Sequence, residues 1–167
     1  MKTEKELRVS IDRAAGVLLK HGLTIAFAES ATAGRVAAEF SLACNAGKFL
    51  SGGIVCYDAK LKTALLDVPP AMIGKYTPES MQVTEAISRG LSKVIPADIH
   101  VGITGLPCPG GSESAEKPVG TMFLFAVKDG VQILAERRVF QGDHQHIVLE
   151  TVRWTADLLV RELGSQS

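Results

Sequence analysis

Serine and lysine side chains occupy the positions in this sequence where chemistry is easiest to place. Ser30 follows a short apolar run at 23–28 and precedes a segment with helical periodicity. A hydroxyl on such a strand-to-helix turn is exposed, and the amides that follow it can face a developing negative charge. This position predicts a serine nucleophile with an oxyanion hole, although capping of the helix is the commonest role of a serine there.

A serine nucleophile needs a general base, and the histidines offer none in an obvious place. One ends a predicted helix, one lies inside a predicted strand, and His144 and His146 are two residues apart on a helix, hence on different faces. Lysine is the other base found with serine, provided that burial or neighbouring positive charge lowers its pKa. Lys60 and Lys62, at the mouth of a predicted strand, are therefore candidates, with solvated helix lysines as the alternative interpretation.

The long loop after residue 105 contains a rival nucleophile. Cys108 lies between two prolines, but no base or helix N-terminus accompanies it, so a buried and inert thiol is the more ordinary interpretation. The loop glycines Gly105, Gly110 and Gly111 could bring backbone amides close to a phosphate. Because the chain has neither a Walker sequence nor G-x-G-x-x-G, this indication of phosphate binding is weak.

Composition and charge limit the class of protein. Hydrophobic residues make up 46% and charged residues 22% of the 167 residues, which is typical of one soluble globular domain. Lys plus Arg and Asp plus Glu number 18 each, so nothing steers nucleic acid or a membrane surface to the chain, and a small-molecule partner is expected. The charged start and the lack of a long apolar stretch predict a cytoplasmic protein without a membrane segment. Three cysteines without C-x-x-C spacing indicate neither disulfides nor a metal site, and no cofactor is expected.

Hydrophobic periodicity predicts the elements that must position these side chains. Helices alternate with strands over two-thirds of the chain, and Asp129-Gly130 suits the type I′ turn of a following hairpin. This order predicts an α/β fold with three layers, α/β/α, a mixed, mostly parallel sheet and a C-terminal antiparallel hairpin. One domain is expected over 1–164, with a frayed tail over 165–167. The expected helices cover 7–19, 32–47, a short stretch that Pro69 and Pro70 end, 79–94 and 143–163, and the expected strands cover 23–28, 52–57, 98–105 and both arms of 119–140.

Five segments are notable together: AESATAGR (28–35), GGIVCYDAKLK (52–62), TGLPCPGG (104–111), EKPVGT (116–121) and FQGDH (140–144). In their order and nearly in their spacing they resemble the CinA carboxy-terminal domain family, the nicotinamide-nucleotide amidases, over essentially the whole chain. The resemblance implies hydrolysis of the carboxamide of nicotinamide mononucleotide to nicotinate mononucleotide and ammonia. It also implies a homo-oligomer that takes a small nucleotide substrate.

The resemblance further implies roles for individual residues. Ser30 falls on the family's nucleophile, and Tyr57 and Lys62 fall on its tyrosine and lysine. Lys62 would take the hydroxyl proton while Ser30 attacks the amide carbon, and water would release the acid from an acyl-enzyme. The expected substrate-binding positions, including the amides of the oxyanion hole, are Ala31, Thr32, Ala33, Gly34, Thr104, Gly105, Gly110, Gly111 and His144.

The chain departs from the family's pattern in the loops that would hold substrate. Ala33 replaces a glycine, Ala59 replaces an asparagine, and the segment 104–111 lacks an aspartate. His144 and Val148 occupy positions where the family has arginines, and neutral imidazole cannot reproduce the bidentate grip of a guanidinium on phosphate. Two alternatives to the amidase therefore remain: a catalytically weak or inactive nucleotide-binding paralogue on the same fold, and a serine hydrolase of another amide or ester.

Overall fold

The computed structural model describes residues 2–165, and in this part of the chain five strands form one sheet in the order β2-β1-β3-β4-β5. β1 (Ile25–Glu29) pairs in parallel with β2 (Leu50–Val55) and with β3 (Ile99–Gly105). β4 (Thr121–Lys128) is antiparallel to both β3 and β5 (Val131–Val139). Four of these strands therefore run in one direction and β4 runs in the other. The predicted mixed, mostly parallel sheet is confirmed.

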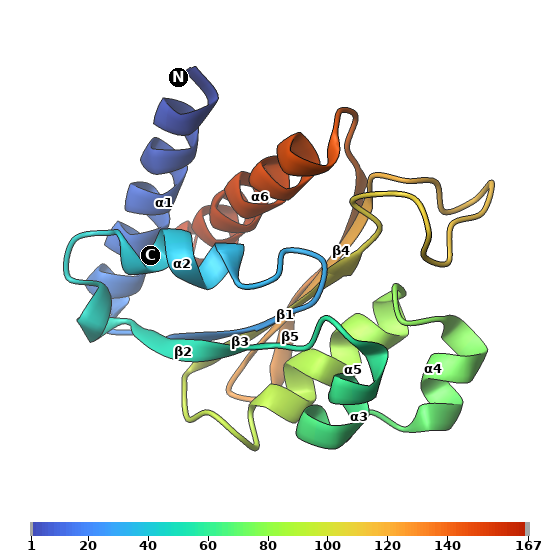
Figure 1. Ribbon diagram of the computed structural model, residues 1–167. Helices are drawn as coiled ribbons and strands as arrows, with labels where there is room; N and C mark the ends of the chain where they lie inside the picture. The colour runs from blue at the N-terminus through green and yellow to red at the C-terminus, as the bar shows by residue number, and fades with distance from the viewer. Residues whose placement is uncertain (1, 166–167) are drawn as a thin grey trace.

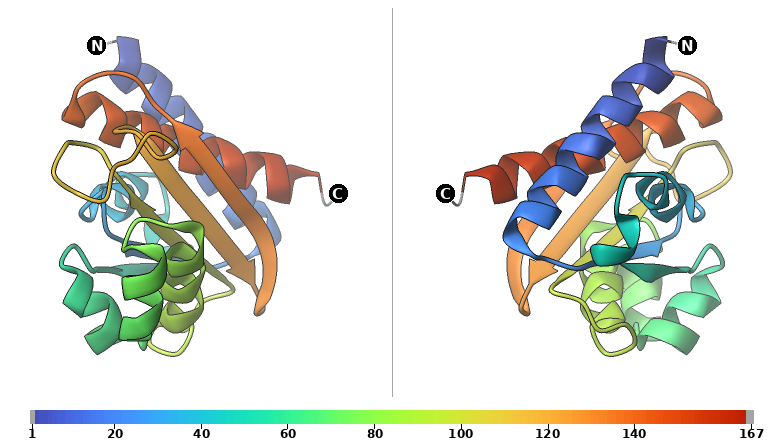
Figure 2. Two further views of the ribbon diagram at one scale, coloured as in Figure 1. Left: turned by 90° about the vertical axis from the view of Figure 1, so that its right-hand side faces the viewer. Right: turned by 90° about the vertical axis from the view of Figure 1, so that its left-hand side faces the viewer.

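Helices cover both faces of the sheet, which confirms the predicted three layers (Figure 1). One face carries α1 (Lys2–His21), α2 (Arg35–Ser41) and α6 (His144–Gly164), and the other carries α3 (Ala59–Leu66), α4 (Pro70–Tyr76) and α5 (Met81–Leu91). A short 3-10 helix, η1 (Ala46–Lys48), precedes β2. The long helices α1 and α6 cross on the outside of their face (Figure 2). None of the helices in the described range is long and apolar enough to pass through a bilayer.

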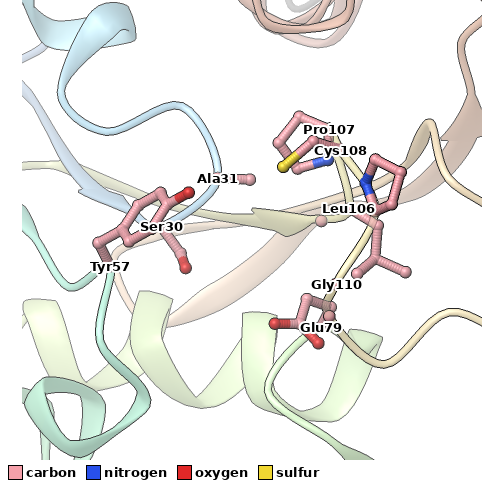
Figure 3. A pocket seen from close by; sticks show the side chains of 11 residues that line it. Ser30, Ala31, Tyr57, Glu79, Leu106, Pro107, Cys108 and Gly110 are labelled. Carbon is pink, nitrogen blue, oxygen red and sulfur yellow. The ribbon is translucent and has the colours of Figure 1, made fainter. Parts of the chain in front are cut away.

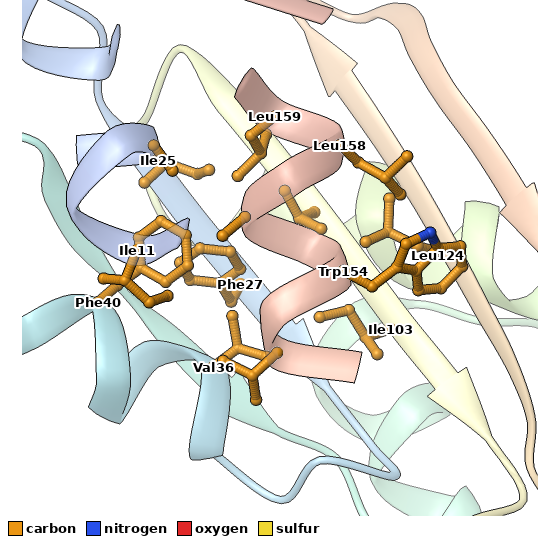
Figure 4. Packing of buried hydrophobic residues seen from close by; sticks show 14 of the residues in the cluster. Ile11, Ile25, Phe27, Val36, Phe40, Ile103, Leu124, Trp154, Leu158 and Leu159 are labelled. Atoms are coloured by element: carbon orange, nitrogen blue, oxygen red, sulfur yellow. The ribbon is translucent and has the colours of Figure 1, made fainter. Parts of the chain in front are cut away.

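Alternate residues of the central strands face two different cores. Ile25 and Phe27 of β1 contribute to the larger core beneath α1, α2 and α6, whereas Ala26 and Ala28 contribute to the smaller core beneath α5. Figure 4 shows how Phe27 packs against Phe40 of α2, with ring centroids 5.0 Å apart. Because β1 is buried on both faces, it has the continuous apolar sequence expected of a parallel strand. Burial of large side chains such as Ile25 and Phe27 stabilises the fold by roughly 1.5–3 kcal/mol each.

α5 lies very close to β3, and this contact positions the loop that follows β3. A Cβ added at Gly102 would lie 2.4 Å from the carbonyl oxygen of Thr84, so only glycine allows the helix to approach. The hydroxyls of Thr84 and Thr104 lie 2.7 Å apart, and the Ser88 hydroxyl donates to the His100 carbonyl at 2.8 Å. These buried hydrogen bonds hold β3 against α5, with the Thr84–Thr104 contact at the carboxyl end of β3 and the Ser88–His100 contact near its other end.

The segment after β1 and the start of α4 differ from expectation. The helix expected over 32–47 is reduced to α2 because residues 31–34 form a turn, in which Ala33 and Gly34 have φ angles of 49° and 91°. Pro70, expected only to end a helix, also begins α4. Proline is accommodated at the first helical position because its missing N–H needs no partner there.

The C-terminal hairpin and the last helix follow the sequence closely. Asp129 and Gly130 have φ angles of 51° and 78°, as both central residues of a type I′ turn require. Asp143 caps α6, its side chain accepting a hydrogen bond from the His146 amide at 2.8 Å. Of the tail expected over 165–167, only Ser165 belongs to the described residues, and it ends α6.

Candidate active site

A cavity of about 260 Å³ opens at the carboxyl ends of β1 and β3, the edge where ligands of open α/β sheets bind (Figure 3). Ser30, Ala31 and Tyr57 form one side of it. Residues 105–111 of the loop after β3 form the opposite side, and Glu79, just before α5, completes the wall. Ser30, Tyr57 and the glycine-containing segment 105–111, which are far apart in the sequence, therefore converge on one cavity.

Ser30 is fixed at the cavity by the sheet. Its amide donates a hydrogen bond to the Ile103 carbonyl of β3 at 3.0 Å, one residue beyond the last paired position of β1. The residue is 6% exposed, and this remaining exposure faces the cavity that it lines. The hydrogen bond to β3 thus determines where the backbone of Ser30 lies and holds its hydroxyl at the cavity.

The side-chain amine of Lys62 lies 2.9 Å from the Ser30 hydroxyl. Asp58 caps the start of α3 by accepting a hydrogen bond from the Lys60 amide at 2.9 Å, and the buried residues of α3 are Lys62 and Leu66, four positions apart on one face. Residues two apart on a helix lie on different faces, so Lys62 points toward the sheet whereas Lys60 is exposed. The Lys62 amine also donates to the carbonyl of Cys56 at 2.9 Å.

Burial makes the Lys62 amine less basic than an ordinary lysine. The residue is 1% exposed, and desolvation lowers its pKa from the usual 10.5. The opposing effects of Cys56, Glu79 and Asp58, which raise this pKa, are smaller. A lysine with a lowered pKa and a serine hydroxyl at hydrogen-bond distance satisfies the two requirements for a serine–lysine nucleophile.

Glu29, which the sequence did not single out, organises the turn that carries Ser30. Its Oε2 atom accepts hydrogen bonds from the Thr32 hydroxyl at 2.6 Å and from the amides of Gly34 and Val36 at 3.0 Å. Its Oε1 atom accepts from the Ala37 amide at 2.8 Å. The buried carboxylate therefore occupies the N-terminal amides of α2, and substrate cannot use them.

Two amides of this turn are free to stabilise an oxyanion. The Ala33 amide donates to the Ser30 carbonyl at 3.0 Å, and the Gly34 amide is bound by the carboxylate described above. Within the described residues, the amides of Ala31 and Thr32 donate to no protein acceptor. Of the four expected binding positions at 31–34, Ala31 lines the cavity, whereas Thr32, Ala33 and Gly34 are not among its lining residues.

The loop after β3 supplies three of the expected binding residues. Gly105, Gly110 and Gly111 line the cavity, whereas Thr104 is fully buried with its hydroxyl paired to α5. The Gly110 amide donates to the Glu113 side chain at 2.8 Å, and this contact holds the pKa of that carboxyl below its usual value. The Gly110 amide, which the sequence analysis considered for phosphate binding, is therefore already bound to a carboxylate of this chain.

Tyr57, Cys108 and His144 have different relations to the cavity. Tyr57 is 57% exposed at the mouth, beside Ser30, and Cys108 lines the wall across from it (Figure 3). No basic side chain of the described residues hydrogen-bonds to Cys108, so the sequence's ranking of this thiol below Ser30 stands. His144, an expected binding residue, is exposed at the start of α6 and does not line the cavity.

A polar cluster beside the cavity was not foreseen from the sequence. The Ser112 hydroxyl donates to Glu79 Oε2 at 2.5 Å. The Lys117 amine donates to the Ser112 hydroxyl at 2.6 Å, to the Glu79 carbonyl at 2.8 Å and to the Thr77 hydroxyl at 2.6 Å, and burial lowers its pKa. The available signal was the position of Glu79 immediately before Ser80, which caps α5 at the ligand-binding edge of the sheet. Among the described residues, no group of three His, Cys, Asp or Glu side chains could hold a metal ion.

The three-layer fold and the Ser30–Lys62 pair define an α/β protein with a candidate serine–lysine site. The sequence profile of the CinA C-terminal domain matches residues 9–163, so the chain belongs to this family. A CinA-like protein of Geobacter sp. (strain M21) is 36% identical over 136 residues, which cover 81% of this chain and 32% of that protein. A CinA-like protein of Citrifermentans bemidjiense is 35% identical over 152 residues, which cover 91% and 36% of the two chains. The chain thus spans about a third of the length of these relatives.

Solved structures share the whole fold. The CinA superfamily protein of Klebsiella pneumoniae 700603 superposes with a TM-score of 0.89 at 26% identity, over 95% of this chain and 98% of that one. The competence/damage inducible protein CihA of Agrobacterium tumefaciens gives a TM-score of 0.87 at 26% identity, over 95% and 96% of the two chains. The α/β/α architecture described above is therefore that of the CinA superfamily.

Proposed function

We propose that this chain is an amidase that hydrolyses the carboxamide of nicotinamide mononucleotide to nicotinate mononucleotide and ammonia. The observation that carries the proposal is the hydrogen bond of 2.9 Å between the Ser30 hydroxyl and a buried lysine amine. The sequence resemblance to nicotinamide-nucleotide amidases supplies the substrate. The cavity of about 260 Å³ next to Ser30 has room for a carboxamide and its ring.

The reaction begins with proton transfer from the hydroxyl. The neutral Lys62 amine takes the Ser30 proton as the oxygen attacks the amide carbon, and the carbonyl electrons move to the oxygen. The amides of Ala31 and Thr32 donate to this oxyanion. When the C–N bond breaks, the Lys62 ammonium gives its proton to the leaving nitrogen, and ammonia departs from an ester on Ser30.

Hydrolysis of the ester reverses these roles. Lys62, neutral again, takes a proton from water as the water oxygen attacks the ester carbon. Collapse of the second tetrahedral species breaks the bond to Ser30, and the proton returns from Lys62 to the serine oxygen. Tyr57, on the wall beside Ser30, is positioned to contact the substrate at the mouth and completes the proposed catalytic group.

Two observations bear on the alternatives, a catalytically weak nucleotide-binding paralogue and a serine hydrolase of another amide or ester. The Gly110 amide is bound to the Glu113 carboxylate, and no cationic side chain of the described residues lines the cavity. Both features weaken the binding of a substrate phosphate in the cavity. They leave the Ser30–Lys62 pair intact, so they affect the choice of substrate more than the chemistry.

The test is direct measurement of ammonia. Purified protein is incubated with nicotinamide mononucleotide, and ammonia and nicotinate mononucleotide are quantified in parallel with a Ser30→Ala sample. We expect equal amounts of the two products from the wild-type protein and none above background from the variant. Stoichiometric binding of the nucleotide without release of ammonia would instead support the paralogue.

The resemblance also implies a homo-oligomer, and the residue composition predicts a cytoplasmic protein; we include both in the proposal. Sedimentation velocity of the purified chain measures the first. We expect a mass that is a small multiple of 17.8 kDa. Fractionation of cells that produce the full-length protein measures the second.

A further inference from the structure

The charge of the cavity wall is set by a single side chain. Among the described residues that line the cavity, Glu79 is the only one with a carboxylate, and none has a lysine, arginine or histidine side chain. Lys62 lies behind Ser30, and Lys117 lies behind Ser112, and neither lines the cavity. A ligand in this cavity therefore meets a carboxylate and no cationic side chain.

The Glu79 carboxylate is held in place by one of its oxygens. Oε2 accepts the Ser112 hydroxyl, and the Lys117 amine holds that hydroxyl together with the Glu79 carbonyl. Within the described residues, Oε1 receives no hydrogen bond from the protein. In Figure 3 the carboxylate lies at the edge of the cavity, across from Ala31 and Cys108, with Ser30 and Tyr57 to one side.

Backbone amides near the cavity that could bind an anion already donate to carboxylates of the chain. The Gly110 amide, which could bind a phosphate, donates to the Glu113 carboxylate. The N-terminal amides of α2 are bound to Glu29. An anionic group inside the cavity would thus face the negative charge of Glu79 without a free positive side chain to compensate it.

We propose that Glu79 determines specificity by pairing with a positively charged ring next to the carboxamide, so that the preferred substrates are cationic pyridinium carboxamides. This inference rests on the proposed amidase function and narrows its substrate class. A nicotinamide ring joined to a sugar through its nitrogen carries a positive charge whether or not the sugar is phosphorylated. Recognition through Glu79 therefore needs no contact with a phosphate.

The test compares two probes with the same carboxamide and different ring charge. 1-Methylnicotinamide is a cation, whereas nicotinamide is neutral, and neither has a sugar or a phosphate. Binding is measured by calorimetry on the folded Ser30→Ala protein, so no turnover is required. We expect the cation to bind at least about tenfold tighter than the neutral amide, a difference of about 1.4 kcal/mol.

Glu79→Gln, added to the Ser30→Ala protein, removes the charge and keeps an oxygen that can accept the Ser112 hydroxyl. We expect this substitution to bring the ratio of the two dissociation constants close to one, mainly by lowering the affinity for the cationic probe. Glu85→Gln is the matched control because it removes one charge from the exposed side of α5, where Glu85 pairs with Arg89. We expect this control to leave the ratio unchanged.

The outcomes separate this inference from the function on which it rests. Equal affinities in the Ser30→Ala protein, a ratio unaffected by Glu79→Gln, or absence of binding by both probes would overturn the role of Glu79, whatever the activity of the wild-type protein. If Glu79 had only a structural role, Glu79→Gln would weaken the binding of both probes equally. This result would also overturn the proposed role of Glu79 in specificity. If the ratio depends on Glu79 but the wild-type protein hydrolyses no carboxamide, the amidase proposal fails and the binding preference remains.

Discussion

The Lys62 amine and the Ser30 hydroxyl lie 2.9 Å apart although 32 positions separate the two residues in the chain. Two independent constraints produce this distance. Parallel pairing of Glu29 with Val55 aligns the ends of β1 and β2, and the buried face of α3, which carries Leu66 and Lys62, directs Lys62 inward. The pair is thus a product of sheet register and helix packing together.

Replacement of Ser30 by Ala should abolish ammonia release and leave the fold intact. The hydroxyl is the proposed nucleophile, so kcat/KM should fall by about 10³-fold or more. The hydrogen bond from the backbone amide of residue 30 to the Ile103 carbonyl is retained, so the free energy of unfolding should change by about 1 kcal/mol or less. Both are measured on one preparation, by ammonia release and by urea unfolding. Ser41→Ala, on the exposed end of α2, is the control, and equal activity of the two variants would rule out Ser30 as the nucleophile.

Lys62 and Lys60 form a natural pair for testing the base. Lys62→Met removes the amine at the serine hydroxyl and should lower kcat by about 10²- to 10⁴-fold. Lys60→Met changes an exposed side chain that the structure places on the other side of α3, so activity should remain near that of the wild type. Steady-state kinetics at one pH are sufficient. Comparable losses in both variants would contradict the assignment of the base.

The pH dependence of the reaction should report the Lys62 amine. A base must be neutral, so kcat/KM should rise with pH through the Lys62 pKa, which burial lowers from the usual 10.5. Glu79 acts to raise this pKa, and Glu79→Gln should therefore move the rising limb to lower pH. Profiles from about pH 5 to about pH 10 measure both effects. A limb that moves to higher pH in the variant would contradict this account of the electrostatics.

Glu29→Gln should destabilise the protein more than the substitution of an exposed glutamate. The buried carboxylate accepts four hydrogen bonds, and a glutamine amide would place N–H groups against some of these donors. A loss of about 3 kcal/mol in the free energy of unfolding is expected from the unsatisfied buried groups. Urea unfolding measures it, with Glu85→Gln as the control. A change below about 0.5 kcal/mol would show that the turn holds its shape without this charge.

Phosphate should contribute little to substrate choice. The ratio of kcat/KM for nicotinamide mononucleotide over the riboside is expected to be small, because the loop amide of Gly110 is bound to Glu113. Glu113→Gln should raise this ratio. His144→Arg should leave it unchanged because His144 does not line the cavity. If the ratio were unchanged in Glu113→Gln and raised in His144→Arg, the substrate phosphate would instead be bound at the start of α6.

The order of helices and strands and the position of Ser30 were predictable from the sequence because they follow from local patterns. Alternation of apolar runs with helical periodicity sets the layers, and a polar residue after a buried strand lies at the ligand edge of the sheet. The choice between Lys60 and Lys62 was different. It depends on which face of α3 packs against the sheet, so the spacing alone left both residues open and the resemblance indicated Lys62.

The features that were not predicted depend on contacts between distant segments. Glu79 reaches Ser112 and Lys117 across 33 and 38 positions of the chain, and no local pattern reports such a contact. The shortening of α2 depends on the hydrogen bonds of the Glu29 carboxylate to amides up to eight residues further on. His144 was placed at the cavity by alignment with the family, but the start of α6 lies away from the lining residues.

The low basicity of Lys62 exists only while the eight-residue helix α3 stays docked. If α3 detaches without the rest of the fold, water reaches the amine, which then takes up a proton as an ordinary lysine does. Protonation is easier in the detached state, so acidification lowers the free energy of this local opening. This effect operates between pH 10.5 and the lowered Lys62 pKa, so amide hydrogen exchange in α3 should accelerate relative to exchange in β1 and β3 as the pH falls through that range.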